Sequence, residues 1–355
     1  MWLDARERIH APEIEGEWLN SPSLKTRELR GRVVLVDFWD YTCVNCLRTL
    51  PYVREWHRRY AASGSAGIPP AEHGLVVVGV HAPEFHFARD RGNVERAVRS
   101  EGLEYPIVLD NDYRTWQAFA NRCWPARYLI DAQGYIRYLH LGEGQYGETE
   151  GAIQRLLRES GVTTPLPALI EPLGASDQPG AHCVSVTPEL YLGYGRGRLG
   201  NDSGYIDNQV ADYTPASGRA VGLVYLEGPW FAGREQIVAC PLLGRESRLR
   251  LRYTAAEVNF VMAPPDSDGL PVEGRATVVV RQDGRPLTVE ESGADIMLDG
   301  DETVVDVTEP RMYRLVRNRQ AGTRELEIWT RKPGLEAYAF TFVACADHPT
   351  LEAGS

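Results

Sequence analysis

Two cysteines separated by two residues, Cys43 and Cys46, are the strongest chemical signal in the sequence. They follow an apolar run of strand type, residues 33–36, and precede apolar residues spaced as on one face of a helix. The free N–H groups and partial positive charge of a helix N-terminus stabilise a thiolate, so Cys43 is the expected nucleophile. Cys46 can reach back to close a disulfide and to resolve a mixed disulfide. The same spacing also occurs as half of a zinc site.

Three neighbouring residues favour a redox disulfide over a zinc site. Asp37 lies six residues before Cys43, Trp39 lies four before it, and Pro51 follows the second cysteine by five. A proline at that point lies inside the helix and should kink it. This spacing resembles that of thioredoxin, which implies a thioredoxin-like fold around a redox-active disulfide.

The thioredoxin family also has a cis-proline loop that faces the disulfide, and Trp124-Pro125 resembles this loop. A cis Pro125 would present the backbone of Trp124 to a substrate strand and keep metal ions from bridging the sulfurs. Trp39, Tyr41 and Trp124 are the expected substrate contacts. Cys123 is either a third redox thiol or a packed thiol.

Two carboxylates are candidates for proton transfer. Asp37 lies in a core strand, where desolvation raises the pKa of a carboxyl and suits it to accept the proton of Cys46. The alternative is a strand-end aspartate bonded to the backbone. Glu84 lies in the loop after the apolar run 75–80. TlpA-like relatives place a glutamate near their disulfide, which implies proton handling, although a solvated loop carboxylate is the alternative. His81 and His86 are expected at the surface or at caps.

Hydrophobic periodicity predicts an α/β unit over residues 1–160. The expected strands are 33–36, 75–80, 106–109, 126–130 and 135–141, and the expected helices are 44–60, 93–101, 115–120 and 148–160. Residues 75–80 form a continuous apolar run, which is typical of a central parallel strand buried on both faces. The order of these elements resembles a thioredoxin fold with an inserted strand–helix unit.

The second half of the chain has a different character. Residues 161–180 contain four prolines and three glycines and are expected to form a linker. Residues 181–355 contain many short strand patterns separated by turns, which predict an all-β sandwich or jelly roll. The cysteines of this half, at 183, 240 and 345, are expected to be small buried side chains. Four aromatic residues are candidates for stacking on sugar, or else ordinary core and rim residues: Tyr191, Tyr194, Trp230 and Phe231.

Five segments together resemble the C-terminal region of DipZ-type thiol–disulfide proteins: residues 38–53, 78–85, 124–131, 188–194 and 334–342. In that family a TlpA-like thioredoxin domain precedes a β-sandwich likened to carbohydrate-binding modules. The resemblance implies a redox domain at 1–160, a linker at 161–180 and a carbohydrate-binding-module-like sandwich at 181–355. DipZ also carries a membrane domain that passes electrons through the membrane, and no corresponding segment is present in this sequence.

Bulk properties limit the partners. The formal net charge of −11 argues against nucleic acid or an anionic membrane surface, and no apolar run approaches the ~20 residues of a membrane span. The N-terminus has no apolar signal core, so the chain is expected to be cytoplasmic, or extracytoplasmic if a signal segment has been removed.

The expected function is exchange with protein disulfides, as a reductase that uses no cofactor or bound metal and is recharged by an electron-donating reductase. Three alternatives stay open. The chain could be a copper- or zinc-handling protein, a thiol peroxidase, or a binding protein in which the sandwich contacts a glycan.

Overall fold

The apolar run that leads to the cysteine pair forms strand β2 (Val33–Trp39) in the computed structural model of the chain, and all seven of its residues are buried. Strands cover both of its edges, and side chains pack on both of its faces. Helix α1 (Val44–Tyr60) begins immediately after Cys43 and contains Pro51. The predicted succession of a buried strand, a cysteine pair and a helix is therefore confirmed.

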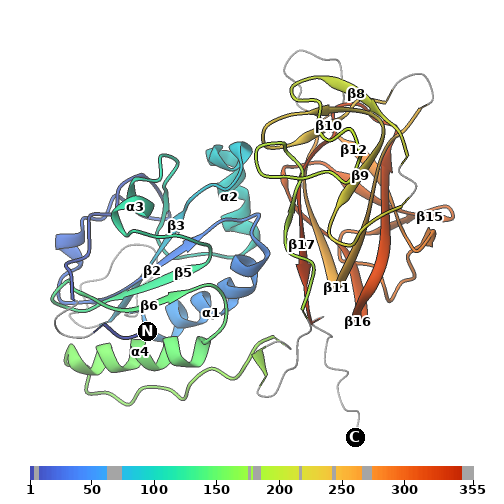
Figure 1. Cartoon of the computed structure of the whole chain (residues 1–355). Coiled ribbons are helices and arrows are strands. Elements are labelled where there is room, and N and C mark those ends of the chain that lie inside the picture. Colours follow the sequence, from blue (N-terminus) through green and yellow to red (C-terminus); the bar gives the residue numbers. More distant parts are fainter. Residues whose placement is uncertain are drawn as a thin grey trace, which may run out of the picture. The chain divides into compact units, whose positions relative to one another are not determined.

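The structure describes residues 1–3, 8–61, 74–174, 177–178, 185–215, 218–241, 245–265 and 274–345. The chain divides into two units, Met1–Asp177 and Gln178–Ser355, which Figure 1 shows in ribbon form. The first is a thioredoxin-like α/β unit, here called the redox unit, and the second is all-β. The fold class expected from the sequence is confirmed.

The sheet of the redox unit has the strand order β1-β4-β3-β2-β5-β6. Its other strands are β1 (Glu17–Leu19), β3 (Leu75–His81), β4 (Ile107–Leu109), β5 (Ala126–Ile130) and β6 (Ile136–Leu141). Strands β2, β3 and β4 run parallel, whereas β5 is antiparallel to β2. The carboxyl end of β2, where the cysteine pair follows, therefore lies beside the beginning of β5.

Helices and turns cover the two faces of this sheet. They are α1, α2 (Arg91–Ser100), α3 (Arg114–Ala118), α4 (Tyr146–Glu159) and the 3₁₀ turns η1 (Thr26–Leu29) and η2 (His86–Arg89). One hydrophobic cluster joins α1, α2 and α4 to one face, and a second cluster joins η1 and the end of α3 to the other. Because side chains alternate along a strand, the odd-numbered residues of β2 face α1.

Residues 162–173, here called the strap, pack against the redox unit although their composition predicted a linker. Three apolar side chains of the strap join the cluster under α1 and α4: Val162, Leu166 and Ile170. The backbone N–H of Ile170 donates to the buried Glu150 carboxylate at 2.7 Å. The N–H of Leu173 donates to the hydroxyl of Tyr52 on α1 at 2.6 Å. The strap is thus held by polar anchors as well as by apolar contacts.

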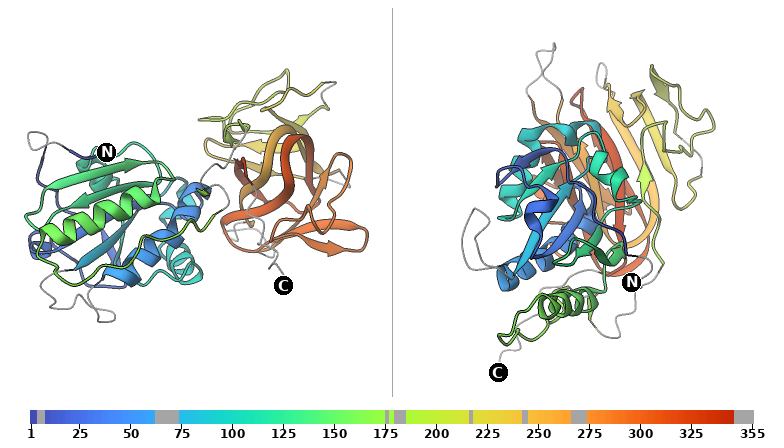
Figure 2. Two further views of the ribbon diagram at one scale, coloured as in Figure 1. Left: turned by 90° about the horizontal axis from the view of Figure 1, so that it is seen from below. Right: turned by 90° about the vertical axis from the view of Figure 1, so that its left-hand side faces the viewer.

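The second unit is built on one curled antiparallel sheet (Figure 2). Its described strands are β7 (Leu190–Tyr191), β8 (Val210–Tyr213), β9 (Val224–Ala232), β10 (Ile237–Ala239), β11 (Ser247–Ala263), β12 (Ala276–Gln282), β13 (Arg285–Pro286), β14 (Met297–Asp299), β15 (Glu302–Val307), β16 (Arg311–Thr330) and β17 (Glu336–Val343). The long strand β11 pairs with β17 along one half and with β9 along the other. Strand β10 joins β17 to β9, so these four strands close into a ring. Their apolar side chains share one core with those of β12, β15 and β16.

The cysteines of the second unit differ from one another. Cys240 is a free thiol that is half-buried, so the expectation of a buried side chain is met only in part. Cys345, just after β17, is disulfide-bonded, so the prediction of a packed thiol there is wrong. Cys183 lies outside the described residues.

Candidate active site

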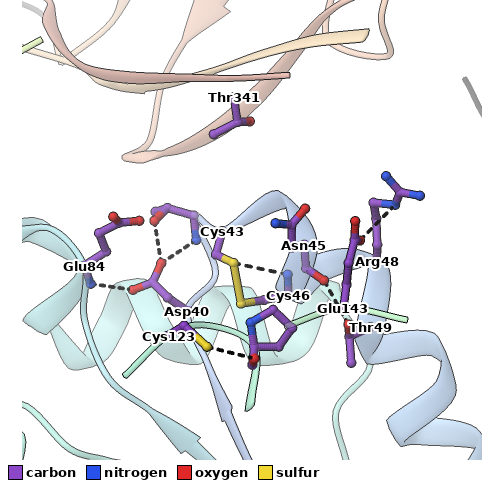
Figure 3. Close-up of a disulfide and its surroundings, with 12 residues drawn as sticks. Asp40, Cys43, Asn45, Cys46, Arg48, Thr49, Glu84, Cys123, Glu143 and Thr341 are labelled. Carbon is purple, nitrogen blue, oxygen red and sulfur yellow. Dashed lines mark hydrogen bonds and ion pairs between the residues drawn. A yellow bond between two sulfur atoms is a disulfide. The ribbon is translucent and has the colours of Figure 1, made fainter. Parts of the chain in front are cut away.

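The two cysteines of the motif form a disulfide whose sulfurs differ in accessibility (Figure 3). Cys43 is the N-cap of α1 and is half-buried, whereas Cys46 lies in the first turn and is fully buried. The backbone N–H of Cys46 points at Sγ of Cys43 at 3.2 Å. A donor at that position stabilises negative charge on sulfur. The geometry therefore supports Cys43 as the attacking sulfur and Cys46 as the resolving sulfur.

The proline loop lies at the same end of the sheet as the disulfide. The Trp124-Pro125 peptide bond is cis, as the sequence predicted. In the ladder between β2 and β5 the last pair is Phe38 with Ala126, so the loop directly adjoins the end of β2. The half-buried Trp124 packs on the same cluster as Cys43. Its contact with substrate stays a prediction.

Asp37 is a buried carboxylate that lacks hydrogen bonds. Its side chain is 1 % exposed, and within the described residues neither of its oxygens has a hydrogen-bond partner. The interpretation as a strand-end aspartate bonded to the backbone is therefore wrong. Burial raises the pKa of Asp37 to about 7, and the positive charge of Arg127 opposes that rise. A carboxyl with this pKa can take up and release a proton near neutral pH.

Arg127 was not identified from the sequence, yet it is the residue opposite Asp37 in the β2–β5 ladder. Its side chain is 0 % exposed. Nη2 donates to the carbonyls of Gly142 at 3.2 Å and Gly144 at 2.7 Å. The guanidinium also lies 5.0 Å from the ring centroid of Tyr146. The sequence does contain a signal for this residue, since Arg127 is the one charged residue in a strand that is otherwise uncharged.

Asp40 organises the turn that leads to Cys43, and the sequence analysis missed it. One carboxylate oxygen accepts hydrogen bonds from the backbone N–H of Thr42 at 2.6 Å and from its hydroxyl at 2.5 Å. The other accepts from the N–H of Glu84 at 2.9 Å. Its carbonyl accepts from the N–H of Cys43 at 3.3 Å. An aspartate two residues before a threonine is typical of such side-chain turns.

His81 is a core residue at the end of β3, so the expectation of a surface or capping role is wrong. Its ring stacks on Tyr41 at 5.6 Å and meets Trp39 edge-on at 5.2 Å. Burial lowers the pKa of His81 to about 3, which leaves the imidazole neutral at physiological pH. Trp39 and Tyr41 are themselves buried. The prediction that these two aromatics contact substrate is wrong, because they pack inward around this histidine.

Glu84 and Cys123 both lie near the disulfide (Figure 3). Glu84 is half-buried, and its backbone N–H is the donor to Asp40; its role in proton handling stays a prediction. Cys123 is a half-buried free thiol whose Sγ–H points at the carbonyl of Pro125 at 3.9 Å. Burial raises the pKa of the Cys123 thiol. A raised pKa keeps it protonated, which makes it a weak nucleophile and favours the packed-thiol interpretation.

The aromatic residues proposed for sugar binding have separate environments. Trp230 is buried and donates from Nε1 to the carbonyls of Glu227 and Arg248, so the prediction of a stacking surface there is wrong. Tyr191 is half-buried, with the guanidinium of Arg196 3.8 Å from its ring centroid. The hydroxyl of Tyr194 is bonded to Asn208. Phe231 is half-buried. Sugar binding by the second unit stays a prediction.

Two further observations concern the described part of the chain. It contains no group of three or more His, Cys, Asp or Glu side chains arranged to hold a metal ion. Among its helices, none combines the length and apolar character that crossing a membrane requires.

Comparison with known proteins agrees with this architecture. Residues 11–156 match the Redoxin family, and residues 187–342 match the family described as thioredoxin like C-terminal domain. Protein DipZ of Mycobacterium tuberculosis is 33% identical over 94% of this chain, which spans 42% of that protein. Thiol-disulfide oxidoreductase YkuV of Bacillus subtilis is 28% identical over 42% of this chain and 95% of its own length.

Among solved structures, a thioredoxin-like protein in its oxidised form is 29% identical, with a TM-score of 0.37, and covers 43% of this chain and 97% of its own. The similarity to DipZ runs through both units, whereas the similarity to YkuV covers less than half of the chain. The chain is thus similar to DipZ through both units, with residues 11–156 matching the Redoxin family and residues 187–342 matching the thioredoxin like C-terminal domain.

Proposed function

We propose that this chain is a thiol–disulfide oxidoreductase that acts on protein disulfides in the direction of reduction. The observation that carries the proposal is the pairing of a half-buried Cys43 at a helix N-terminus with a buried Cys46. The buried Asp37 lies on the face of β2 that packs against α1. The similarity to DipZ and YkuV supports the same reaction class.

The reaction starts from the reduced dithiol. The thiolate of Cys43 attacks one sulfur of the substrate disulfide, whose S–S bond breaks and releases a substrate thiolate. Cys46 then loses its proton to Asp37 and attacks Sγ of Cys43. The mixed disulfide breaks, the second substrate thiolate leaves, and the Cys43–Cys46 disulfide forms. Two electrons have moved to the substrate, so an external dithiol donor must reduce the enzyme again.

Trapping the mixed disulfide tests this proposal and identifies the partner. In Cys46→Ser the resolving thiol is absent, so attack by Cys43 should stop at a covalent complex that mass spectrometry can identify. The Cys43→Ser, Cys46→Ser double variant is the matched control, because it keeps Cys123 and Cys240. Equal capture by both variants would contradict the proposal, and stoichiometric copper or zinc on the purified protein would favour metal handling instead.

The identity of the trapped proteins also tests the compartment. We propose a cytoplasmic site of action, and the expected partners are then cytoplasmic proteins with exchangeable disulfides. Envelope proteins or a membrane-bound electron donor among the trapped species would place the reaction outside the cytoplasm. In a separate assay, Cys43→Ser should abolish dithiothreitol-coupled reduction of insulin while the fold is retained.

A further inference from the structure

The core of the redox unit contains one acid and one base directly opposite each other on neighbouring strands. Asp37 and Arg127 are partners in the antiparallel β2–β5 ladder, and both side chains are buried on the face that packs against α1. Opposed residues of such a ladder have Cβ atoms about 5 Å apart. Neither group reaches the other within 4.0 Å to form an ion pair, and the carboxylate has no hydrogen bond in the described residues. The two buried groups therefore interact through their charges and not through a direct hydrogen bond.

The guanidinium is fixed by groups other than the carboxylate. Two carbonyls of the segment after β6, those of Gly142 and Gly144, accept from Nη2. The rings of Trp56 on α1 and Tyr146 on α4 lie 5.8 and 5.0 Å from the guanidinium carbon. Nε and Nη1 have no hydrogen-bond partner in the described residues. This clamp holds a positive charge next to Asp37 without neutralising it.

The other groups around the pair do not supply a competing positive charge. On β3 the residue opposite Asp37 is Gly79, and a side chain there would meet Trp39 and the ring of Tyr105. Tyr105 is a buried phenol whose own pKa is raised by burial and then by the charge of Asp37. Further along β3, His81 is neutral because burial lowers its pKa to about 3.

The elements packed on the guanidinium itself bring phenols, one carboxylate and one histidine. The histidine is His140, which is opposite Arg127 in the β5–β6 ladder and whose pKa is lowered by burial and then by the charge of Arg127. Tyr138 of β6, Tyr146 of α4 and Glu143 interact electrostatically with Arg127. On the α1 side, Cys46 is held in the disulfide. Arg127 is thus the cation that acts on Asp37.

We infer that Arg127 is a positioning residue for the exchange reaction: its fixed positive charge opposes the effect of burial, so that part of the Asp37 population is ionised near neutral pH and ready to take the proton of Cys46. The catalytic part of this inference, that Asp37 takes the proton of Cys46, rests on the proposed function. The electrostatic part, that Arg127 lowers the pKa of Asp37, can be tested without turnover. An isolated carboxyl buried this deeply would stay protonated at neutral pH and could not act as a base. With Arg127 opposite, burial raises the pKa of Asp37 only to about 7, a value that suits proton transfer in both directions at neutral pH.

The decisive measurement is the titration of Asp37 in the oxidised 355-residue chain, followed through ¹³C-labelled aspartate carboxyls by NMR. Arg127→Met removes the charge and keeps much of the volume, so the titration midpoint should move upward by about one pH unit or more. Arg127→Lys keeps a charge and should restore most of the original midpoint. An unchanged midpoint in Arg127→Met would overturn the inference.

A matched control separates charge from packing. Arg137 is a second buried arginine of the same unit; it is bound to Asp131 at 2.9 Å and is not among the charges that act on Asp37. Arg137→Met should leave the Asp37 midpoint unchanged, even if it loosens the fold. If Arg127→Met fails to fold, Arg127→Lys and Arg127→Gln provide the same contrast between a charged and a neutral side chain.

A kinetic readout connects the titration to the reaction. The rate at which Cys46 resolves a preformed mixed disulfide should follow the ionisation of Asp37, so its pH profile should shift alkaline in Arg127→Met. In an Asp37→Asn background the Arg127 substitution should cause no such shift. A normal shift in the NMR titration with no exchange by the wild-type protein would refute the proposed function and leave the electrostatic relationship intact.

Discussion

Nε2 of His81 lies 3.6 Å from Oδ2 of Asp40, and both side chains are fully buried beneath the turn that leads to Cys43. Burial lowers the pKa of the histidine to about 3, so this contact is not an ion pair at neutral pH. Burial also raises the pKa of Asp40, although its hydrogen bonds to Thr42 and Glu84 oppose the rise. The role of Asp40 is therefore that of a hydrogen-bond acceptor that joins two loops at the redox centre.

The Asp40 turn can be tested by an isosteric change. Asp40→Asn keeps one acceptor oxygen but replaces the other with an amide NH₂ group. This group cannot accept from the N–H of Thr42 or of Glu84, so at least one of these buried donors loses its partner. The expected loss of stability is about 1–3 kcal/mol. Displacement of the turn should slow insulin reduction by roughly tenfold. Asp112→Asn, at an exposed aspartate, is the control and should leave both denaturant unfolding and rate unchanged. Equal behaviour of the two variants would contradict the assigned role.

The stability of the oxidised protein should depend on pH through Asp37. Its pKa is about 7 in the folded state against 3.8 for an ordinary aspartate. The folded state therefore binds this proton more tightly, and stability is lost as pH rises from about 4 to about 7. Asp37→Asn should stabilise the protein by about 2 kcal/mol more at pH 8 than at pH 5. Calorimetric unfolding at the two pH values measures this difference, and a gain that does not vary with pH would count against the raised pKa.

Cys123→Ser should change the rate of disulfide exchange by less than about twofold, because burial raises the pKa of the Cys123 thiol and keeps it protonated. The measurement is the rate of insulin reduction at pH 7 in the variant and in the wild type. A loss comparable to that of Cys43→Ser would instead make Cys123 a third member of the redox centre.

The strap depends on one buried carboxylate. Glu150 is 1 % exposed and accepts from the Tyr60 hydroxyl at 2.6 Å and from the Ile170 N–H at 2.7 Å. In Glu150→Gln an amide NH₂ group replaces one carboxylate oxygen and faces either the Tyr60 hydroxyl or the Ile170 N–H, which then loses its acceptor. This change should destabilise the redox unit by about 1–3 kcal/mol. Limited proteolysis should then cut within residues 162–173 sooner. Glu148→Gln, on the exposed side of the same helix, should leave the cleavage pattern unchanged.

The parts of this site that sequence reasoning could predict are those fixed by local spacing. The cysteine pair, Asp37 and the cis Pro125 all follow from short motifs. Arg127 could not be assigned in this way, because its importance depends on the register between β2 and β5. That register pairs Asp37 with a residue 90 positions later in the sequence (127 minus 37), and no local motif joins the two.

The inward turn of Trp39 and Tyr41 was missed for a related reason. Aromatic side chains near a redox motif occur both on substrate-binding surfaces and in cores. Here they lie in the core, because both pack against the buried His81 at the end of β3, and this contact cannot be read from the local sequence. The strap was missed because proline and glycine content predicts a linker, whereas its anchors lie 20 and 121 residues away in sequence.

The strap also bears on how such a redox unit could be passed between proteins by gene fusion. A recombination joint placed just after Ser160 would remove the N–H donors that Glu150 and Tyr52 receive from the strap. It would also uncover the apolar surface that Val162, Leu166 and Ile170 protect. A transferable module must therefore carry its strap with it, and because the Tyr52 hydroxyl also donates to Asp177, new partners can be grafted only beyond Asp177.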